Sequence, residues 1–185
     1  PLGEWVLRTA CEQVKSWQEL TDRPLRISVN VSARQFKEGN LVELTKSILK
    51  ELDLSANLLE LEITEGLLLS DDPETDIIMR DLSDLGVRLA IDDFGTGYSS
   101  LSYLKRFPFD VLKIDRAFIK DVTTDPEDAA LTRAIIAMAH GLGLKVIGEG
   151  VETEEQLAFL QAEGCNMIQG YLVSRPMDAD AFTDR

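Results

Sequence analysis

The hydrophobic positions of this chain follow two periods that alternate along its length. Short apolar runs typical of buried strands are each followed by a longer segment with apolar residues at helical spacing. The predicted strands are Leu25–Val31, Leu58–Thr64, Val87–Ile91, Asp110–Ile114, Leu144–Ile147 and Asn166–Ile168. This alternation predicts a parallel sheet with helices packed outside it.

Capping residues mark where several of the intervening helices begin. The N-terminal signals are Asp72-Pro73, Asp125-Pro126 and a Thr153/Gln156 capping box. The chain itself opens with a predicted amphipathic helix, Pro1–Leu20. Its apolar positions are Leu2, Trp5, Val6, Ala10, Val14 and Trp17.

The number of strand–helix units limits the possible architectures. Each unit takes roughly 30 residues, so a closed eight-unit barrel would need about 250. A chain of 185 residues therefore forms either an open six-stranded sheet or a barrel that lacks two units. Because the sequence starts inside a helix and without methionine, we favour the barrel. The expected fold is a TIM-like (β/α)8 barrel of the α/β class with its first two strand units missing. Residues 1–185 would form a single domain that lacks its N-terminal part.

One stretch, LAIDDFGTGYSSL from Leu89 to Leu101, carries the strongest functional signal. A buried strand ends there in two adjacent carboxylates, Asp92 and Asp93, and a glycine turn follows. Adjacent side chains of a strand point to opposite faces, so both acids can reach one site only where the strand ends and twists. The structural alternative is that the pair caps the following helix.

Polar residues also stand at the carboxyl ends of the other strands. In chain order the ends carry Asn30, Glu62, Asp92 with Asp93, Lys113 with Asp115, Glu149 and Gln169. Each has a structural explanation: Asn30 could cap a turn, Lys113 could pair with Asp115, and Glu149 could form an outward salt bridge. Because barrels place their chemistry at this edge, a shared site explains all of them together.

The residue types at these ends narrow the chemistry. Carboxylates with one amide, and without histidine or cysteine, suit hard cations such as Mg²⁺ or Mn²⁺. Two such ions would make an acidic pocket bind phosphate and would activate a water. Lys113 could hold that water or neutralise charge, and Glu149 could bind the second ion or act as a base. His140 lies on the helix before the fifth predicted strand, so we expect a structural role for it.

Composition excludes several partners. The net charge of −14 argues against a nucleic-acid polymer or an anionic membrane surface as a direct partner. A small anionic ligand remains possible where cations lie between it and the protein. No apolar run reaches the length of a membrane span. Cys11 and Cys165 allow a disulfide, but reduced thiols are the simpler interpretation.

Six motifs, in order and in spacing, resemble one family over essentially the whole chain. They are NVSARQF (30–36), LEITE (61–65), DDFGTGYSSL (92–101), LKID (112–115), GEGVET (148–153) and QGYLVSRP (169–176). Together they are similar to the EAL-domain cyclic di-GMP phosphodiesterases of bacteria. The resemblance implies a barrel enzyme that uses two Mg²⁺ or Mn²⁺ ions to hydrolyse cyclic di-GMP to linear pGpG.

The resemblance also implies roles for individual residues. Asn30, Glu62 and Asp92 would ligate the first metal, with Asp92 bridging to a second ion held by Asp93 and Glu149. Lys113 would contact the attacking water. Glu65 would anchor the loop after Asp93, where residues 94–100 would link the active site to a homodimer interface. Asp115, Glu152 and Gln169 match further substrate or loop positions.

The sequence departs from the family in one respect. The Glu-Ala-Leu motif, whose glutamate is a metal ligand, is absent, as is the neighbouring arginine that contacts the substrate phosphate. Activity would therefore belong to the intact domain, and this chain alone would be inactive. The resemblance implies a cytoplasmic domain with upstream regulatory domains, in a parent protein that could be anchored to the inner membrane.

Two other functions stay open from the sequence. A catalytically inactive receptor would bind cyclic di-GMP and signal through the loop after Asp93. An enolase-type barrel lyase would use a similar combination of lysine and acids at strand ends.

Overall fold

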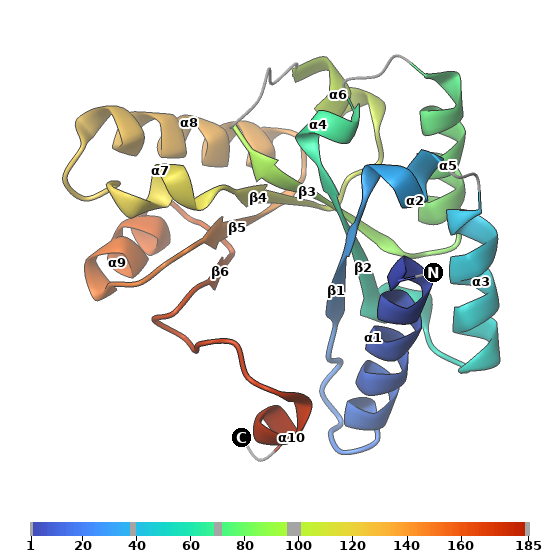
Figure 1. Cartoon of the computed structure of the whole chain (residues 1–185). Helices are drawn as coiled ribbons and strands as arrows, with labels where there is room; N and C mark the ends of the chain where they lie inside the picture. Colours follow the sequence, from blue (N-terminus) through green and yellow to red (C-terminus); the bar gives the residue numbers. More distant parts are fainter. Residues whose placement is uncertain (1, 38–39, 69–71, 96–100, 184–185) are drawn as a thin grey trace. The chain divides into compact units, whose positions relative to one another are not determined.

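The computed structural model describes all residues except 1, 38–39, 69–71, 96–100 and 184–185. In the described part of the chain, six strands form one sheet in the order in which they occur in the sequence (Figure 1). They are β1 (Ile27–Val31), β2 (Leu59–Thr64), β3 (Arg88–Phe94), β4 (Val111–Ile114), β5 (Lys145–Glu149) and β6 (Met167–Gln169). The pairs β1/β2, β4/β5 and β5/β6 are parallel. This arrangement confirms the predicted class, an α/β fold with the strand order of a TIM-like barrel.

Helices connect the strands, as the hydrophobic period predicts. The α-helices are α1 (Leu2–Gln18), α2 (Ala33–Lys37), α3 (Leu41–Glu51), α4 (Glu65–Leu68), α5 (Pro73–Asp84), α6 (Leu101–Arg106), α7 (Arg116–Lys120), α8 (Pro126–Gly141), α9 (Glu154–Ala162) and α10 (Ala179–Thr183). A short 3₁₀ turn, η1 (Ala56–Leu58), precedes β2. The short helices α4 and α7 were not predicted, because four or five residues are too few to show a helical period.

The chain divides into two compact units. The first comprises Pro1–Ile63, Leu67–Ala90 and Asp178–Arg185, and the second Thr64–Gly66 and Ile91–Met177. In the first unit, α1 packs against β1 and α3; in the second, α7 and α8 pack against β5 (Figure 1).

The first helix buries only some of its apolar positions. Leu7, Cys11 and Val14, at spacings of four and three residues, form its buried stripe. Leu2 is 76% exposed and Trp5 is 63% exposed. The predicted amphipathic helix is confirmed, and which of its apolar positions are buried is decided by packing, because periodicity alone does not select one stripe.

The predicted caps are confirmed. The Asp72 and Asp125 carboxylates accept hydrogen bonds from the amides two residues on, at 3.0 and 2.8 Å. Thr153 and Gln156 form the reciprocal capping box of α9. These local hydrogen bonds need no tertiary information, so the sequence predicts them well.

The cysteines and the histidine have structural roles. Cys11 and Cys165 are both free thiols, as expected. Burial raises the pKa of the Cys11 thiol to about 11, so this group stays protonated at neutral pH. His140 Nε2 lies 3.1 Å from the side-chain oxygen Oδ1 of Asn166, which also accepts from the Val146 amide at 2.8 Å.

A close backbone approach fixes the turn after β6. A Cβ atom on Gly170 would collide with the backbone nitrogen and carbonyl oxygen of Val151. Two backbone hydrogen bonds hold Val151 in place: its amide donates to the Gln169 carbonyl at 3.1 Å, and its carbonyl accepts from the Leu172 amide at 3.0 Å. We therefore expect Gly170→Ala to lower the free energy of unfolding by about 3 kcal/mol in urea denaturation.

The matched control is Gly141→Ala. Gly141 is the last residue of α8, and a Cβ atom there would meet nothing within 4 Å. We expect this substitution to change the free energy of unfolding by less than about 1 kcal/mol. Equal effects of the two substitutions would show that the approach of Val151 to Gly170 is not a constraint on the fold.

Candidate metal and phosphate site

The ends of β1 and β2 place an amide beside a carboxylate in the first unit. Asn30 and Glu62 are partners in the parallel register, and Asn30 Nδ2 donates to Glu62 Oε2 at 3.1 Å. Since the amide donates through its nitrogen, its carbonyl oxygen is the atom that can ligate a cation. Glu62 is buried although it is ionisable, which is costly without polar or cationic partners.

The same strand buries a second acid that sequence reasoning missed. Glu60 accepts a hydrogen bond from the Ser28 hydroxyl at 3.0 Å, and its other oxygen lies 3.4 Å from Arg88 Nε. Along β2, Glu60 and Glu62 alternate with leucine and isoleucine, and the whole strand is buried except Thr64. The alternation of acids and apolar residues was the available signal, because it indicates a polar interior face.

At the end of β3 the backbone conformation redirects the side chain of one of two adjacent acids. Asp93 adopts φ 53°, in the left-handed region, whereas Asp92 continues the strand. This conformation changes the direction of the second side chain, so both carboxylates lie on the same side. Both acids of the Asp92–Asp93 pair can therefore reach one site, because the strand twists where it ends. The alternative, a cap on the following helix, involves residues 96–100, which lie outside the described residues.

Lys113 of β4 is the central cation of the second unit. Its Nζ lies 3.0 Å from Asp92 Oδ1 and 2.7 Å from Glu149 Oε1, and its side chain is only 3% exposed. A buried ammonium group requires such partners. The sequence left open a pairing with Asp115, but Asp115 caps α7 by accepting from the Ala117 amide at 2.7 Å.

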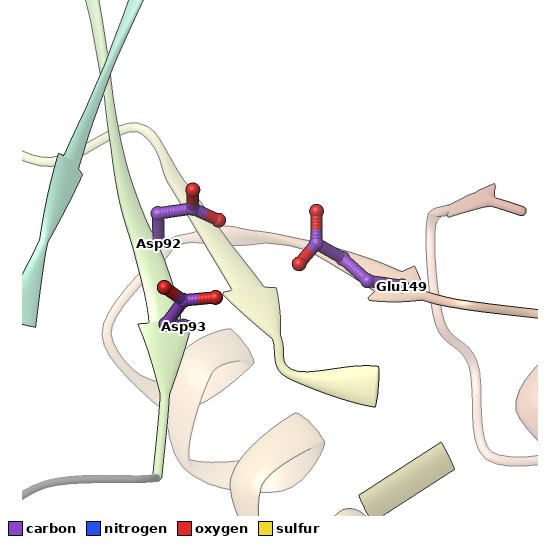
Figure 2. Close-up of side chains that lie close together, drawn as sticks. All are labelled: Asp92, Asp93 and Glu149. Atoms are coloured by element: carbon purple, nitrogen blue, oxygen red, sulfur yellow. The ribbon is translucent and has the colours of Figure 1, made fainter. Parts of the chain in front are cut away.

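Three carboxylates converge around this lysine. Oxygen atoms of Asp92, Asp93 and Glu149 all lie within 4.8 Å of one another. Figure 2 shows the carboxylates of Asp92 and Asp93, at the end of β3, facing that of Glu149 from β5. Lys113 compensates only one of the three charges. The pKa of Asp93 is raised by desolvation, then by repulsion from Asp92 and a hydrogen bond to Asp115.

These residues fit a divalent cation. Asp92 Oδ1 is buried and, although it lies near the Lys113 ammonium, accepts no hydrogen bond of good geometry from the described residues. A buried oxygen acceptor without a well-placed donor has a lone pair that can ligate a metal ion. Together with two neighbouring carboxylates, it offers the oxygen ligands that Mg²⁺ and Mn²⁺ prefer.

Glu65, at the start of α4, reaches the turn after β3 within the second unit. Its Oε2 accepts from the Gly95 amide at 3.4 Å, while Oε1 is buried without a hydrogen-bond partner among the described residues. The predicted contact of Glu65 with the loop is thus seen at Gly95. The remainder of that loop, residues 96–100, is outside the described part.

The last two predicted residues, Glu152 and Gln169, are both exposed. Glu152 is exposed and lines a cavity with Arg116 and Lys120. Gln169 is exposed at the end of β6 and is the register partner of Glu149. Sequence reasoning missed Arg116 and Lys120, for which adjacency to the LKID motif was the only signal.

The fold and this group of acids define the class: an α/β protein with a polyanionic site at the carboxyl ends of its strands. Comparison with known proteins identifies the family. The EAL domain model matches residues 1–176, and the chain belongs to that family and not to the enolase-type lyases.

Relatives and solved structures agree with this assignment. The chain is 46% identical over 183 residues to the cyclic di-GMP phosphodiesterase NbdA of Pseudomonas aeruginosa, covering 99% of the chain and 23% of NbdA. It is 42% identical over 182 residues to the cyclic di-GMP phosphodiesterase PdeR of Escherichia coli, covering 98% of the chain and 27% of PdeR. The chain thus spans about a quarter of the length of these relatives.

Among solved structures, the PaMucR phosphodiesterase in complex with c-di-GMP superposes with a TM-score of 0.93 at 46% identity, covering 98% of this chain and 73% of that one. The EAL domain of Mycobacterium smegmatis DcpA gives 0.94 at 41% identity, covering 100% and 83%. Within the described residues, no helix is both long and apolar enough to cross a membrane.

Proposed function

We propose that this chain is part of a metal-dependent phosphodiesterase that hydrolyses cyclic di-GMP to linear pGpG. The observation that carries the proposal is the convergence of Asp92, Asp93 and Glu149 around the buried Lys113. Two relatives of this family, 46% and 42% identical to the chain, are named cyclic di-GMP phosphodiesterases, which supports the substrate.

The metal ligands are divided between two ions, Mg²⁺ or Mn²⁺. Asn30, Glu62 and Asp92 would hold the first ion, and Asp92 would bridge to a second held by Asp93 and Glu149. When bound, the ions attract a phosphodiester into an acidic pocket and lower the pKa of a water. The raised pKa of Asp93 supports its role, because a carboxylate that is desolvated and lies beside another acid is stabilised in its charged form by a cation.

Lys113 and Glu149 would act on the reacting groups. The Lys113 ammonium would orient the attacking water and stabilise charge that develops on the phosphoryl oxygens. Glu149 would take a proton from that water. The water oxygen would form a bond to phosphorus, the bond from phosphorus to the ribose 3′ oxygen would break, and the proton taken by Glu149 would return through solvent to that 3′ oxygen. The products are one 5′ phosphate and one free 3′ hydroxyl, as in pGpG.

The roles of the remaining predicted residues follow the family pattern. Glu65 would anchor the loop after Asp93, and that loop with α6 would join two copies in a homodimer. Asp115, which caps α7, would hold a substrate or loop position beside Asp93. Glu152 and Gln169 would contact the substrate.

We further propose that residues 1–185 belong to a single EAL domain, together with a Glu-Ala-Leu motif that these residues do not contain. Upstream regulatory domains and a cytoplasmic location of this domain, in a parent protein that could be membrane-anchored, are part of the same proposal. The full-length protein is therefore the proper material for every activity assay.

Metal removal provides the direct test. We expect full-length protein stripped with EDTA to lose at least about 100-fold of its cyclic di-GMP hydrolysis, and Mn²⁺ or Mg²⁺ to restore it. Chromatography of the products would show pGpG. Full turnover in EDTA would contradict the proposal, whereas metal-dependent binding without any pGpG would indicate the inactive receptor.

The affinity for metal should also depend on pH. Because the pKa of Asp93 is raised in the metal-free protein, a cation must displace its proton at acidic pH. We expect Mn²⁺ affinity, measured by calorimetry, to weaken as the pH falls towards the pKa of this group. An affinity that is constant down to pH 4 would contradict a role for Asp93 as a ligand.

A further inference from the structure

A cavity of about 380 Å³ opens beside the acidic group in the second unit. Two of its lining residues, Gly150 and Arg116, directly follow Glu149 and Asp115 in the chain. Its walls are α7, the segment that follows β5 and the first turn of α9. The lining residues are Arg116, Ala117, Lys120, Gly150, Glu152 and Gln156.

The walls of the cavity are held together by specific contacts. The buried Gln156 side chain accepts from the Glu152 amide at 2.7 Å and donates to the Lys120 carbonyl oxygen at 3.0 Å. Gly150 adopts φ 67°, and a Cβ atom there would lie 2.5 Å from Cβ of Arg116. The segment after β5 therefore packs directly on α7, and the cavity is a preformed part of the fold.

The described residues that line the cavity carry more positive than negative charge. Arg116 and Lys120 are exposed and form no ion pair with any of the described residues. Glu152 is the single carboxylate among the described lining residues, so cations outnumber anions in this set. In a protein of net charge −14, two unpaired cations beside a cluster of acids are a local exception that suits an anionic ligand.

The proposed substrate has two phosphodiesters, and the carboxylates with their cations hold only the one that is cleaved. The second phosphate carries a negative charge that must be compensated elsewhere. We propose that Arg116 and Lys120 bind this second, uncleaved phosphate in the cavity and thereby select a dinucleotide over a single phosphodiester. This inference rests on the proposed function.

The test compares two substrates in the full-length protein with Mn²⁺. Cyclic di-GMP reaches both places, whereas bis(p-nitrophenyl) phosphate has one phosphodiester and reaches only the carboxylates. Arg116→Gln and Lys120→Gln keep most of each side chain and remove its charge. We expect each substitution to raise the KM for cyclic di-GMP about tenfold, with kcat within about threefold. The kcat/KM for the single diester should stay unchanged.

Two controls sharpen this comparison. Lys145→Gln removes an exposed cation at the opposite end of β5 and should leave the kinetic constants for both substrates unchanged. Arg116→Lys keeps the charge and should recover most of the lost affinity. Dissociation constants for cyclic di-GMP in Ca²⁺ provide the same comparison if the protein binds without hydrolysis.

The outcomes separate the two proposals. If the wild-type protein hydrolyses cyclic di-GMP and the Arg116→Gln and Lys120→Gln variants both keep its KM and dissociation constant, only the phosphate subsite is wrong. An equal loss on both substrates would also overturn the subsite, because it would show a general effect on the metal site. If the wild-type protein neither binds nor hydrolyses cyclic di-GMP, the proposed function fails and the subsite fails with it.

Discussion

Asp92→Asn is expected to abolish the hydrolysis of cyclic di-GMP, lowering kcat by about 1000-fold or more. The substitution keeps the size of the side chain but removes the charge of the carboxylate proposed to bridge both ions. Asp92 is buried, and its Oδ1 is the acceptor that lacks a well-placed donor in the metal-free protein. Its neutral replacement should therefore lose Mn²⁺ binding as well as turnover.

The matched control is Asp84→Asn. Asp84 is exposed at the end of α5, so the same chemical change there should leave kcat and Mn²⁺ binding unaltered. Product formation would be followed by chromatography and bound Mn²⁺ by calorimetry. Turnover by the Asp92 variant that equals the wild type would reject the assignment of this aspartate.

For the Lys113→Met variant, we expect bound metal to restore most of the lost stability but not the lost activity. In EDTA the variant leaves Asp92 and Glu149 without their shared cation, at 3.0 and 2.7 Å in the native protein. Removing one partner of a buried ionic group costs about 3–5 kcal/mol in the free energy of unfolding. Bound Mn²⁺ supplies positive charge to the same carboxylates, so it should recover much of this loss.

Activity should not recover in the same way. If Lys113 orients the water and stabilises developing charge, kcat stays at least about 100-fold low even with saturating Mn²⁺. Thermal unfolding with and without Mn²⁺, alongside kcat, separates the two effects. Lys145→Met is the control, because Lys145 is exposed at the start of β5. A variant that is destabilised in EDTA but fully active in Mn²⁺ would show that Lys113 serves the fold alone.

The sequence predicts local structure well where short-range hydrogen bonds decide it. The caps at Asp72, Asp125 and Thr153 follow from residues two or three positions apart. The six strands follow from apolar runs bounded by turn residues. By contrast, the buried face of α1 depends on which of two stripes meets β1, and this is tertiary information.

The site shows the same division. Adjacency at strand ends predicts that Asp92, Asp93 and Glu149 gather, because parallel strands end at one edge. The partner of Lys113 was not decided by sequence, since Asp115 is two residues away and Asp92 is on another strand. The left-handed backbone at Asp93 and the cavity beside α7 arise only when the chain is folded.

The central claim is that these acidic and amide groups bind a pair of divalent ions. The most direct measurement is anomalous diffraction at the manganese edge from crystals of the full-length protein grown with Mn²⁺ and cyclic di-GMP. We predict two peaks, both within ligand distance of Asp92, one also bound by Asn30 and Glu62 and the other by Asp93 and Glu149. Peaks that avoid Asp92, or none at all at saturating Mn²⁺, would contradict it.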